Sequence, residues 1–268
     1  MKLELHEPFR TLWAGKDPFV EVERLQGQVY RELEGRRTLR TEVDGRGFFV
    51  KIHRGIGWGE IAKNLTTAKA PVLGAGQEQR ALQRLHQAGV PTMTAVAYGE
   101  RGGNPARQHS FIITEELAPT VDLEVFSLHW RQQPPEPRLK RALIARVALM
   151  VGAMHRAGVN HRDCYICHFL LHTGRPVSAD DFELSVIDLH RAQTRQTTPR
   201  RWRDKDLAAL YFSALDIGLT QRDKLRFLRG YFRQPLRDVL RSEARLLGWL
   251  ERKAAKLYDR KQRYGDLL

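Results

Sequence analysis

The sequence has no long apolar run, few cysteines and no recognisable targeting segment, and each absence excludes a class of protein. None of its 268 residues belongs to an uninterrupted apolar stretch that approaches the roughly 18 residues of a membrane-spanning helix. The first seven residues mix apolar and charged side chains, unlike the apolar core of a secretory signal. Two cysteines cannot build a disulfide framework. These absences predict a cytoplasmic protein that does not cross a membrane.

Positive charge is what the sequence has in excess. It holds 45 Lys and Arg residues against 31 Asp and Glu residues, which gives a net charge of +14. More than half of this excess falls in residues 200–268. Such a balance fits an anionic partner, whether nucleic acid, a phosphorylated ligand, an acidic protein or an acidic lipid surface. It also fits a basic face that only contacts water.

The sequence pattern divides the chain into two lobes. The predicted strands cover residues 29–43 with a turn near Gly35, then 48–52 after a hairpin at Asp44-Gly45, and 95–98 and 111–114. A helix is predicted over residues 77–88, a second over 143–154, and a helical pattern runs from Trp202 to the end. We therefore predict an α+β fold with a β-rich N-terminal lobe, residues 1–117, and an α-helical C-terminal lobe, residues 118–268.

The string Cys164-x-x-Cys167-His168 has three interpretations as a reactive or cofactor-binding site. It matches the haem-attachment motif, which goes with export, and a thioredoxin-like dithiol, whose βαβ context is missing here. Together with His161 it also offers four zinc ligands, but within eight residues, which is tighter than the usual paired spacing. We therefore expect both thiols to be packing residues.

Four charged residues follow one another in the order that a protein kinase requires. Lys51 lies within a predicted strand, and Glu78 lies in the first turns of the next helix. A His-Arg-Asp triplet that ends at Asp163 follows the long helix, and Asp188 ends a short apolar strand. Each feature alone is weak, but the four occur in this order in the kinase fold. The order predicts a two-lobed protein-kinase-like fold.

Phosphoryl transfer gives each of these residues a task. Lys51, oriented by Glu78, would hold the α- and β-phosphates of ATP, and Asp188 would bind Mg²⁺. Asp163 would accept the proton of the acceptor hydroxyl. The expected cofactors are therefore ATP and Mg²⁺.

Three further positions complete the predicted nucleotide site. Backbone groups of Glu115 and Leu117, where the last strand of the N-terminal lobe ends, would meet the adenine. Gly35 stands alone in the segment where a kinase would carry a G-x-G-x-x-G loop. The phosphate clamp is therefore expected to differ from that of protein kinases.

The catalytic loop departs from the protein-kinase pattern as well. Its usual asparagine is His168 here, and an imidazole nitrogen suits Mg²⁺ poorly. We expect His168 to form a hydrogen bond, with metal ligation as the alternative. Asp206 is expected either to brace the catalytic loop by accepting backbone N–H groups or to be an ordinary acid near a helix N-terminus. These departures favour a compact kinase that acts on a small molecule or a lipid.

Six segments carry a resemblance to a known family, namely residues 8–13, 71–75, 110–115, 160–171, 187–192 and 200–206. Through them, and over nearly its whole length, the chain resembles the lipopolysaccharide core heptose(I) kinase family, the WaaP/RfaP group. In this resemblance Asp163 matches the catalytic aspartate. The segment that contains Asp163 also accounts for the Cys-x-x-Cys-His string without metal or haem.

The resemblance implies ATP-dependent phosphorylation of the 4-hydroxyl of the first inner-core heptose on a lipid A–core acceptor. It implies work at the inner face of the inner membrane, on an anionic surface, and an association with acidic acyl carrier protein. Nucleic acid is not an expected partner. The alternatives are a kinase for another sugar, such as the second heptose or an aminoglycoside-like molecule, and a basic pseudokinase or nucleic-acid-binding module.

Residues 221–232 predict a helix with a basic stripe. Leu225, Leu228 and Phe232 are expected to face the core. The arginines that recur at helical spacing are Arg222, Arg226, Arg229 and Arg233, and we call them the arginine stripe. The stripe either contacts water or meets anionic lipid or the acidic groups of the acceptor.

Overall fold

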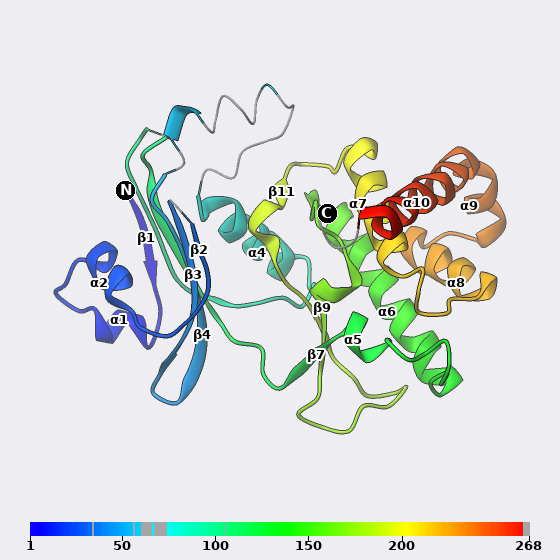
Figure 1. Cartoon of the computed structure of the whole chain (residues 1–268), viewed down its shortest axis with the longest axis horizontal. Coiled ribbons are helices and arrows are strands. Elements are labelled where there is room, and N and C mark those ends of the chain that lie inside the picture. Colours follow the sequence, from blue (N-terminus) through cyan, green and yellow to red (C-terminus); the bar gives the residue numbers. More distant parts are fainter. Residues whose placement is uncertain (34, 56, 60–65, 67–73, 105, 265–268) are drawn as a thin grey trace. The chain divides into compact units, whose positions relative to one another are not determined.

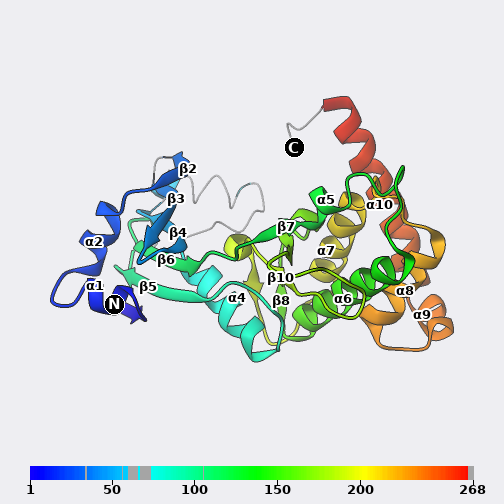
Figure 2. The same cartoon turned by 90° about the horizontal axis from the view of Figure 1, so that it is seen from below.

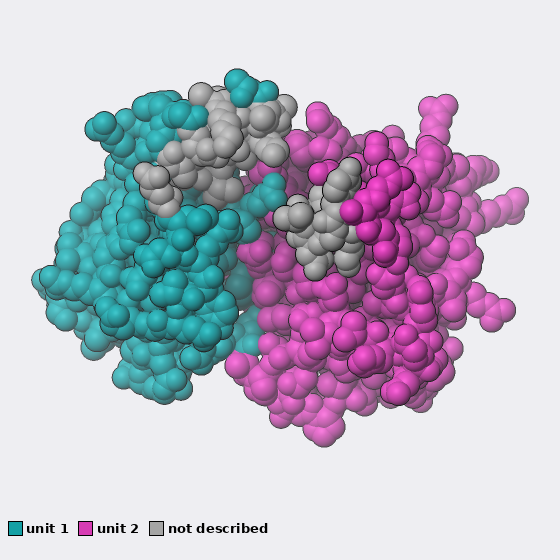
Figure 3. Space-filling model, in the orientation of Figure 1, with its two compact units in different colours: residues 1–83, 93–117, 189–191 teal, residues 84–92, 118–188, 192–268 magenta. Residues whose placement is uncertain are grey.

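Two compact units make up the protein (Figure 3). The computed structural model describes residues 1–264 except 34, 56, 60–65, 67–73 and 105. Unit 1 comprises residues 1–83, 93–117 and 189–191, and unit 2 comprises residues 84–92, 118–188 and 192–268. No helix within the described ranges has both the length and the apolar character of a membrane span.

Unit 1 is built on a six-stranded antiparallel sheet with the order β1-β5-β6-β4-β3-β2. Its strands are β1 (Lys2–Leu5), β2 (Gln28–Leu33), β3 (Arg36–Val43), β4 (Arg46–His53), β5 (Ala95–Arg101) and β6 (His109–Glu115). The hairpin predicted at Asp44-Gly45 joins β3 to β4, and both turn residues have positive φ, 52° and 71°. A two-residue turn of this kind matches the twist of the flanking strands.

Two short helices that the sequence pattern did not indicate cover this sheet. They are α1 (Phe9–Leu12) and α2 (Pro18–Arg24), and Figure 1 shows both beside the sheet. Phe9 and Phe19 are buried in one core cluster with Phe48 and Phe111 of the sheet. Asp17 caps α2 by accepting a hydrogen bond from the backbone N–H of Phe19. The apolar side chains of the helices thus seal one face of the sheet.

Unit 2 is mainly helical, which confirms the predicted α+β plan. Its helices are α5 (Leu123–Phe126), α6 (Pro137–Arg156), α7 (Arg200–Ser213), α8 (Gln221–Phe232), α9 (Leu236–Ser242) and α10 (Ala244–Tyr264). Its strands are β7 (Thr120–Asp122), β8 (Val159–Asn160), β9 (Phe169–His172), β10 (Leu184–Val186) and β11 (Gln193–Thr194), paired as β10-β9-β7 and β11-β8. Helix α4 (Gly76–Gln87) contributes residues to both units.

Helix α6 carries the predicted apolar stripe into the core of unit 2. Its N-terminus is capped by Glu136, whose carboxylate accepts two backbone N–H groups, with Pro137 as the first helical residue. Gly158 follows its C-terminus with φ 79°, and its N–H donates to the carbonyl of His155. A Cβ at Gly158 would overlap the carbonyl oxygen of Arg195. Only glycine therefore fits where the chain turns from α6 into the predicted catalytic loop.

Helix α8 has the predicted bounds, and its most buried residues are polar ones that were not predicted. It lies beside α6 in both views (Figure 1, Figure 2). Its buried residues are Asp223 and Tyr231, whereas Leu225 and Leu228 line a cavity of about 200 Å³ in unit 2 and Phe232 is half-buried. The predicted apolar residues thus face the interior of unit 2, and the burial of Asp223 and Tyr231 with hydrogen-bond partners is the part that an apolar period cannot reveal.

Candidate functional site

Asp206 holds the backbone of the predicted catalytic loop. It is buried on α7, where its Oδ2 accepts the N–H of His161 at 2.6 Å and its Oδ1 accepts the N–H of Arg162 at 2.9 Å. Such charge-assisted bonds are stronger than neutral ones. Of the two interpretations of Asp206, the loop brace is confirmed. Arg162 has a φ of 75°, so the brace also stabilises a backbone conformation that is costly for a residue other than glycine.

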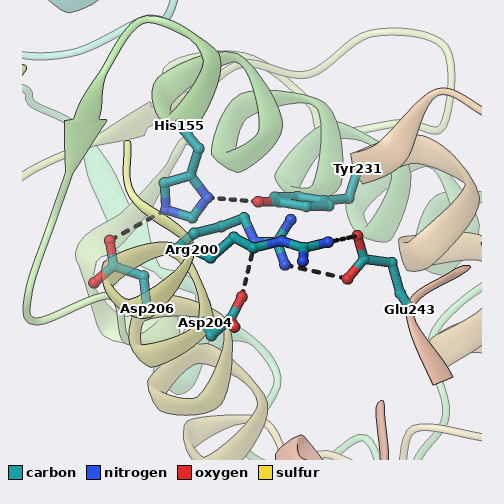
Figure 4. Close-up of polar contacts among 7 residues, drawn as sticks. His155, Arg200, Asp204, Asp206, Tyr231 and Glu243 are labelled. Carbon is teal, nitrogen blue, oxygen red and sulfur yellow. Dashed lines mark hydrogen bonds and ion pairs between the residues drawn. The ribbon is translucent and has the colours of Figure 1, made fainter. Parts of the chain in front are cut away.

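A buried relay extends from Asp206 to α8 (Figure 4). His155 of α6 places Nε2 3.2 Å from Asp206 Oδ2 and Nδ1 2.7 Å from the hydroxyl of Tyr231. Because the carboxylate only accepts hydrogen bonds, the Nε2–H of His155 donates to Asp206, and Nδ1 faces the hydroxyl of Tyr231. Burial raises the pKa of Tyr231 well above its usual value, so the hydroxyl keeps its proton. No sequence motif predicts this relay, because its residues lie on three separate helices.

The same helix α7 is anchored at its other side by arginine–carboxylate pairs (Figure 4). Arg203 donates from Nε to Asp204 at 2.8 Å and from Nη2 to Glu243 at 3.2 Å, and Arg200 lies 3.4 Å from Glu243. These contacts and the loop brace fix the first two turns of α7.

His168 links Asp163 to Asp188 within unit 2. Its Nδ1–H donates to the backbone carbonyl of Asp163 at 2.7 Å, and its Nε2 lies 3.5 Å from Asp188 Oδ2. The ring stacks on that of His161 at 5.4 Å between centroids. His161 in turn donates from Nε2 to the carbonyl of Ile187 at 2.9 Å, and burial lowers the pKa of His161. The predicted catalytic-loop and strand-end residues are therefore brought together.

Asp188 has the features of a cation ligand. Its side chain is 32% exposed and its φ is 59°, a strained conformation for a residue other than glycine. A carboxylate oxygen fits Mg²⁺, whereas the nearby Nε2 of His168 is a softer donor. The described part of the chain holds no group of three or more His, Cys, Asp or Glu residues that could bind a metal. On this geometry Asp188 fits the predicted metal role better than His168.

Lys51 and Glu78 form a buried ion pair in unit 1. Lys51 lies on β4 and Glu78 in the first turn of α4, with 2.7 Å between Nζ and Oε1. Their side chains are 12% and 1% exposed. Neighbouring His53 is also buried, and burial together with the charges of Arg36, Lys51 and His190 lowers its pKa to about 3. Burial is the larger cause, so the imidazole of His53 stays neutral beside the Lys51–Glu78 pair.

The remaining predicted nucleotide contacts lie at the margins of the same sheet. Glu115 is the last residue of β6. Its N–H donates to the carbonyl of Thr94 at 2.9 Å, and its side chain pairs with Arg46. Leu117 is the last residue of segment 93–117 of unit 1. Gly35 has φ 77°, and a Cβ there would overlap the carbonyl oxygen of Gly55. The crowded turn thus accounts for the glycine at position 35 without a phosphate.

The two cysteines are held in their protonated forms. Cys164 is fully buried, and burial raises its pKa well above the usual value; burial also raises the pKa of Cys167 to about 11. Metals and disulfide exchange require the thiolate.

Replacing both Cys164 and Cys167 by alanine is therefore expected to preserve measurable phosphate transfer, and elemental analysis of the wild type should find no stoichiometric zinc. Zinc that disappears on substitution would contradict this expectation.

Comparison with known proteins gives matches over the whole chain. A family model described as the lipopolysaccharide kinase (Kdo/WaaP) family matches residues 20–231. The lipopolysaccharide core heptose(I) kinase WaaP of Pseudomonas aeruginosa PAO1 is 81% identical over 268 residues, which is 100% of both chains. The protein of the same name from Escherichia coli K12 is 55% identical over 263 residues, covering 98% of this chain and 99% of the relative. A solved structure of WaaP in complex with acyl carrier protein matches with a TM-score of 0.88 and 74% identity, over 96% of this chain and 100% of that one.

Proposed function

The chain belongs to the lipopolysaccharide kinase (Kdo/WaaP) family, and we propose that it transfers phosphate from ATP to the 4-hydroxyl of the first heptose of the lipopolysaccharide core. The resemblance predicted from the sequence is thereby confirmed, and the relatives that are named heptose(I) kinases favour this sugar over the alternatives. The observation that carries the proposal is the clamped loop before Asp163, held by both carboxylate oxygens of Asp206. Phosphoryl transfer depends mainly on the positioning of the reacting groups, and Asp206 fixes the backbone of the loop that carries Asp163.

Asp163 is the proposed general base. The brace at Asp206 and the hydrogen bond from His168 to the Asp163 carbonyl fix the backbone on both sides of its carboxylate. A fixed carboxylate can accept the proton of a sugar hydroxyl as the new oxygen–phosphorus bond forms. The role of His168 is then to orient Asp163 and to limit the movement of Asp188.

The proposed nucleotide site belongs to the N-terminal lobe, residues 1–117, and the acceptor site to the C-terminal lobe, residues 118–268. Mg²⁺ bound with ATP would neutralise the phosphate charge and polarise the transferred group. Asp188 would hold the metal, and Lys51, oriented by Glu78, would donate hydrogen bonds to the phosphates. Backbone groups of Glu115 and Leu117 would bind the adenine.

Transfer of labelled phosphate from ATP to dephosphorylated core oligosaccharide tests this function. NMR of the product identifies the phosphorylated hydroxyl. Phosphate at the 4-position of the first heptose is the expected result. Transfer only to the second heptose or to an unrelated sugar would contradict the proposed substrate.

Replacing Lys51 by alanine is expected to lower kcat/KM for ATP by roughly ten- to hundredfold, because a charge-assisted hydrogen bond to the phosphates is lost. Of the residues that the structure describes, Lys51 is the only ion-pair partner of the buried Glu78. The substitution therefore leaves a buried charge unpaired, which destabilises unit 1. Steady-state kinetics with thermal unfolding separates the two effects. Lys16→Ala, at a half-exposed position of the same unit, is the control. Normal turnover of Lys51→Ala would contradict the proposed role.

We also propose two partners for the enzyme. Acyl carrier protein is one, since the neighbouring WaaP structure contains it and the chain carries a net charge of +14 that suits an acidic protein. The other is the anionic cytoplasmic face of the inner membrane, where a lipid A–core acceptor would be presented. Three residues of the arginine stripe, Arg222, Arg229 and Arg233, are exposed, while Arg226 pairs with Asp223 at 2.9 Å.

Substitution of the whole arginine stripe by glutamine tests the membrane contact. Each basic residue near an anionic leaflet contributes about 1 kcal/mol, so the variant should bind anionic vesicles weaker by orders of magnitude at low salt. Cosedimentation at increasing salt measures this. The control removes the same charge from unit 1, at Lys2, Arg10, Lys16 and Arg24. Equal binding of the stripe variant and the wild type at every salt concentration would show that the stripe faces water.

A further inference from the structure

Three cations surround one indole ring at the start of α7. The distances to the centroid of the half-buried Trp202 ring are 5.8 Å for the Arg195 guanidinium, 5.3 Å for Arg201 and 4.5 Å for the Lys205 ammonium. We call these four residues the Trp202 cluster. Arg201 and Lys205 are exposed, so the cluster is accessible from solvent.

The Trp202 cluster is fixed to the catalytic loop. Trp202 precedes Asp206 by four residues, so both lie on the same face of α7. The Asp206 carboxylate binds the two backbone amides just before Asp163. Arg195 donates from Nη1 to the side-chain oxygen of Asn160 at 2.6 Å, which ties the cluster to the same loop from a second direction. Rigid supports on both sides are typical of a built site rather than of a mobile basic surface.

Among the described residues, no carboxylate forms an ion pair with a cation of the Trp202 cluster. Arg195 bonds to the neutral amide oxygens of Asn160 and Gln193, at 2.6 and 2.7 Å. For the three cations of the cluster, the described residues supply no carboxylate within 4.0 Å. The nearby carboxylates Asp204 and Glu243 pair with other arginines of α7.

Further positive charge surrounds the ammonium of Lys205. Its partial desolvation, followed by the charges of Arg201, Lys253 and Arg162, holds the pKa of Lys205 below its ordinary value. Because like charges repel, the free energy of these groups falls when an anion binds among them. The guanidinium of Arg201 can bind a carboxylate or a phosphate through two parallel hydrogen bonds.

We propose that the Trp202 cluster is a subsite that binds an anionic group, a carboxylate or a phosphate, of the sugar acceptor. The subsite orients the acceptor beside Asp163, and it rests on the proposed function for the identity of that acceptor. Productive binding then requires acidic substituents on the oligosaccharide in addition to its reacting hydroxyl.

The test compares the double variant Arg201→Gln/Lys205→Gln with the wild type on a deacylated, water-soluble core oligosaccharide. Deacylation removes any contribution of the membrane. We expect KM and the calorimetric Kd for this oligosaccharide to rise ten- to hundredfold, as for the loss of charge-assisted hydrogen bonds, with KM for ATP changed less than twofold. The control variant Arg237→Gln/Arg245→Gln removes the same charge from exposed positions on α9 and α10 and should match the wild type.

Modified oligosaccharides identify the anion and provide the outcome that would overturn the proposal. Methyl esterification removes carboxylate charge in one preparation, and dephosphorylation removes phosphate in another. The modification that abolishes the difference in affinity between the double variant and the wild type identifies the anionic group that the cluster binds. The proposal fails if the double variant binds the unmodified oligosaccharide as tightly as the wild type does. It also fails if the double variant loses as much affinity for an oligosaccharide without carboxylate and phosphate charge as it loses for the unmodified one. If the wild type binds the oligosaccharide but phosphorylates no heptose, the proposed function fails, and calorimetric affinity alone decides on the subsite.

Discussion

Asp163→Ala is expected to lower kcat by roughly 10²–10⁴, the usual range for a positioned acid–base group. The substitution removes the carboxylate that would accept the proton of the acceptor hydroxyl. It leaves the backbone contacts of the loop in place, because Asp206 and His168 bind main-chain atoms. Steady-state phosphate transfer, measured with saturating ATP and acceptor, reports the change in kcat.

The control for this prediction is Asp180→Ala. The side chain of Asp180 is 84% exposed, so its removal should leave kcat and thermal unfolding unchanged. Circular dichroism must show that Asp163→Ala is folded. A folded Asp163→Ala variant that keeps most of its turnover would refute the assignment of the general base.

Asp206→Ala should have the largest effect on stability. It leaves the buried N–H of His161 and the half-buried N–H of Arg162 without their acceptor, and it removes the partner of His155. At about 1–3 kcal/mol for each buried polar group left unsatisfied, we expect a loss of roughly 3–9 kcal/mol. Urea unfolding measures the loss, and kcat should fall with it because the loop that carries Asp163 is no longer fixed.

The milder variant Asp206→Asn keeps the test decisive if the alanine variant does not fold. Its amide has one oxygen, which can accept only part of the hydrogen bonds that the carboxylate accepts. We expect stability and kcat between those of the wild type and of Asp206→Ala. Asp238→Ala, at an exposed position on α9, should change the free energy of unfolding by less than about 0.5 kcal/mol. Full activity of Asp206→Asn would show that the brace is not needed for turnover.

Features with a strong local signal were predictable from the sequence. The Asp44-Gly45 hairpin follows from turn chemistry, and the bounds of α8 at Gln221 and Phe232 follow from its apolar period. Strand β1 was missed because its first three residues are exposed, so it lacks the alternation of a half-buried strand.

Only those parts of the candidate site whose residues belong to a sequence motif were predictable. The order of charged residues predicted the Lys51–Glu78 contact and the approach of Asp188 to the catalytic loop. The relay from Tyr231 through His155 was missed, because each residue alone looks like an ordinary helix residue. Long-range hydrogen bonds of buried polar groups depend on packing between helices, which local periodicity does not encode.

Gly158 sets a limit on how this sequence can diverge. Its positive φ, and the carbonyl of Arg195 that occupies the space of a Cβ, exclude every side chain there. The same contact fixes the backbone of Arg195, whose guanidinium belongs to the Trp202 cluster. Among functional variants from a saturation library, position 158 should therefore tolerate glycine alone, even though this residue touches neither nucleotide nor sugar in the proposed reaction. Mutational escape from an inhibitor bound beside this turn would have to come from other positions.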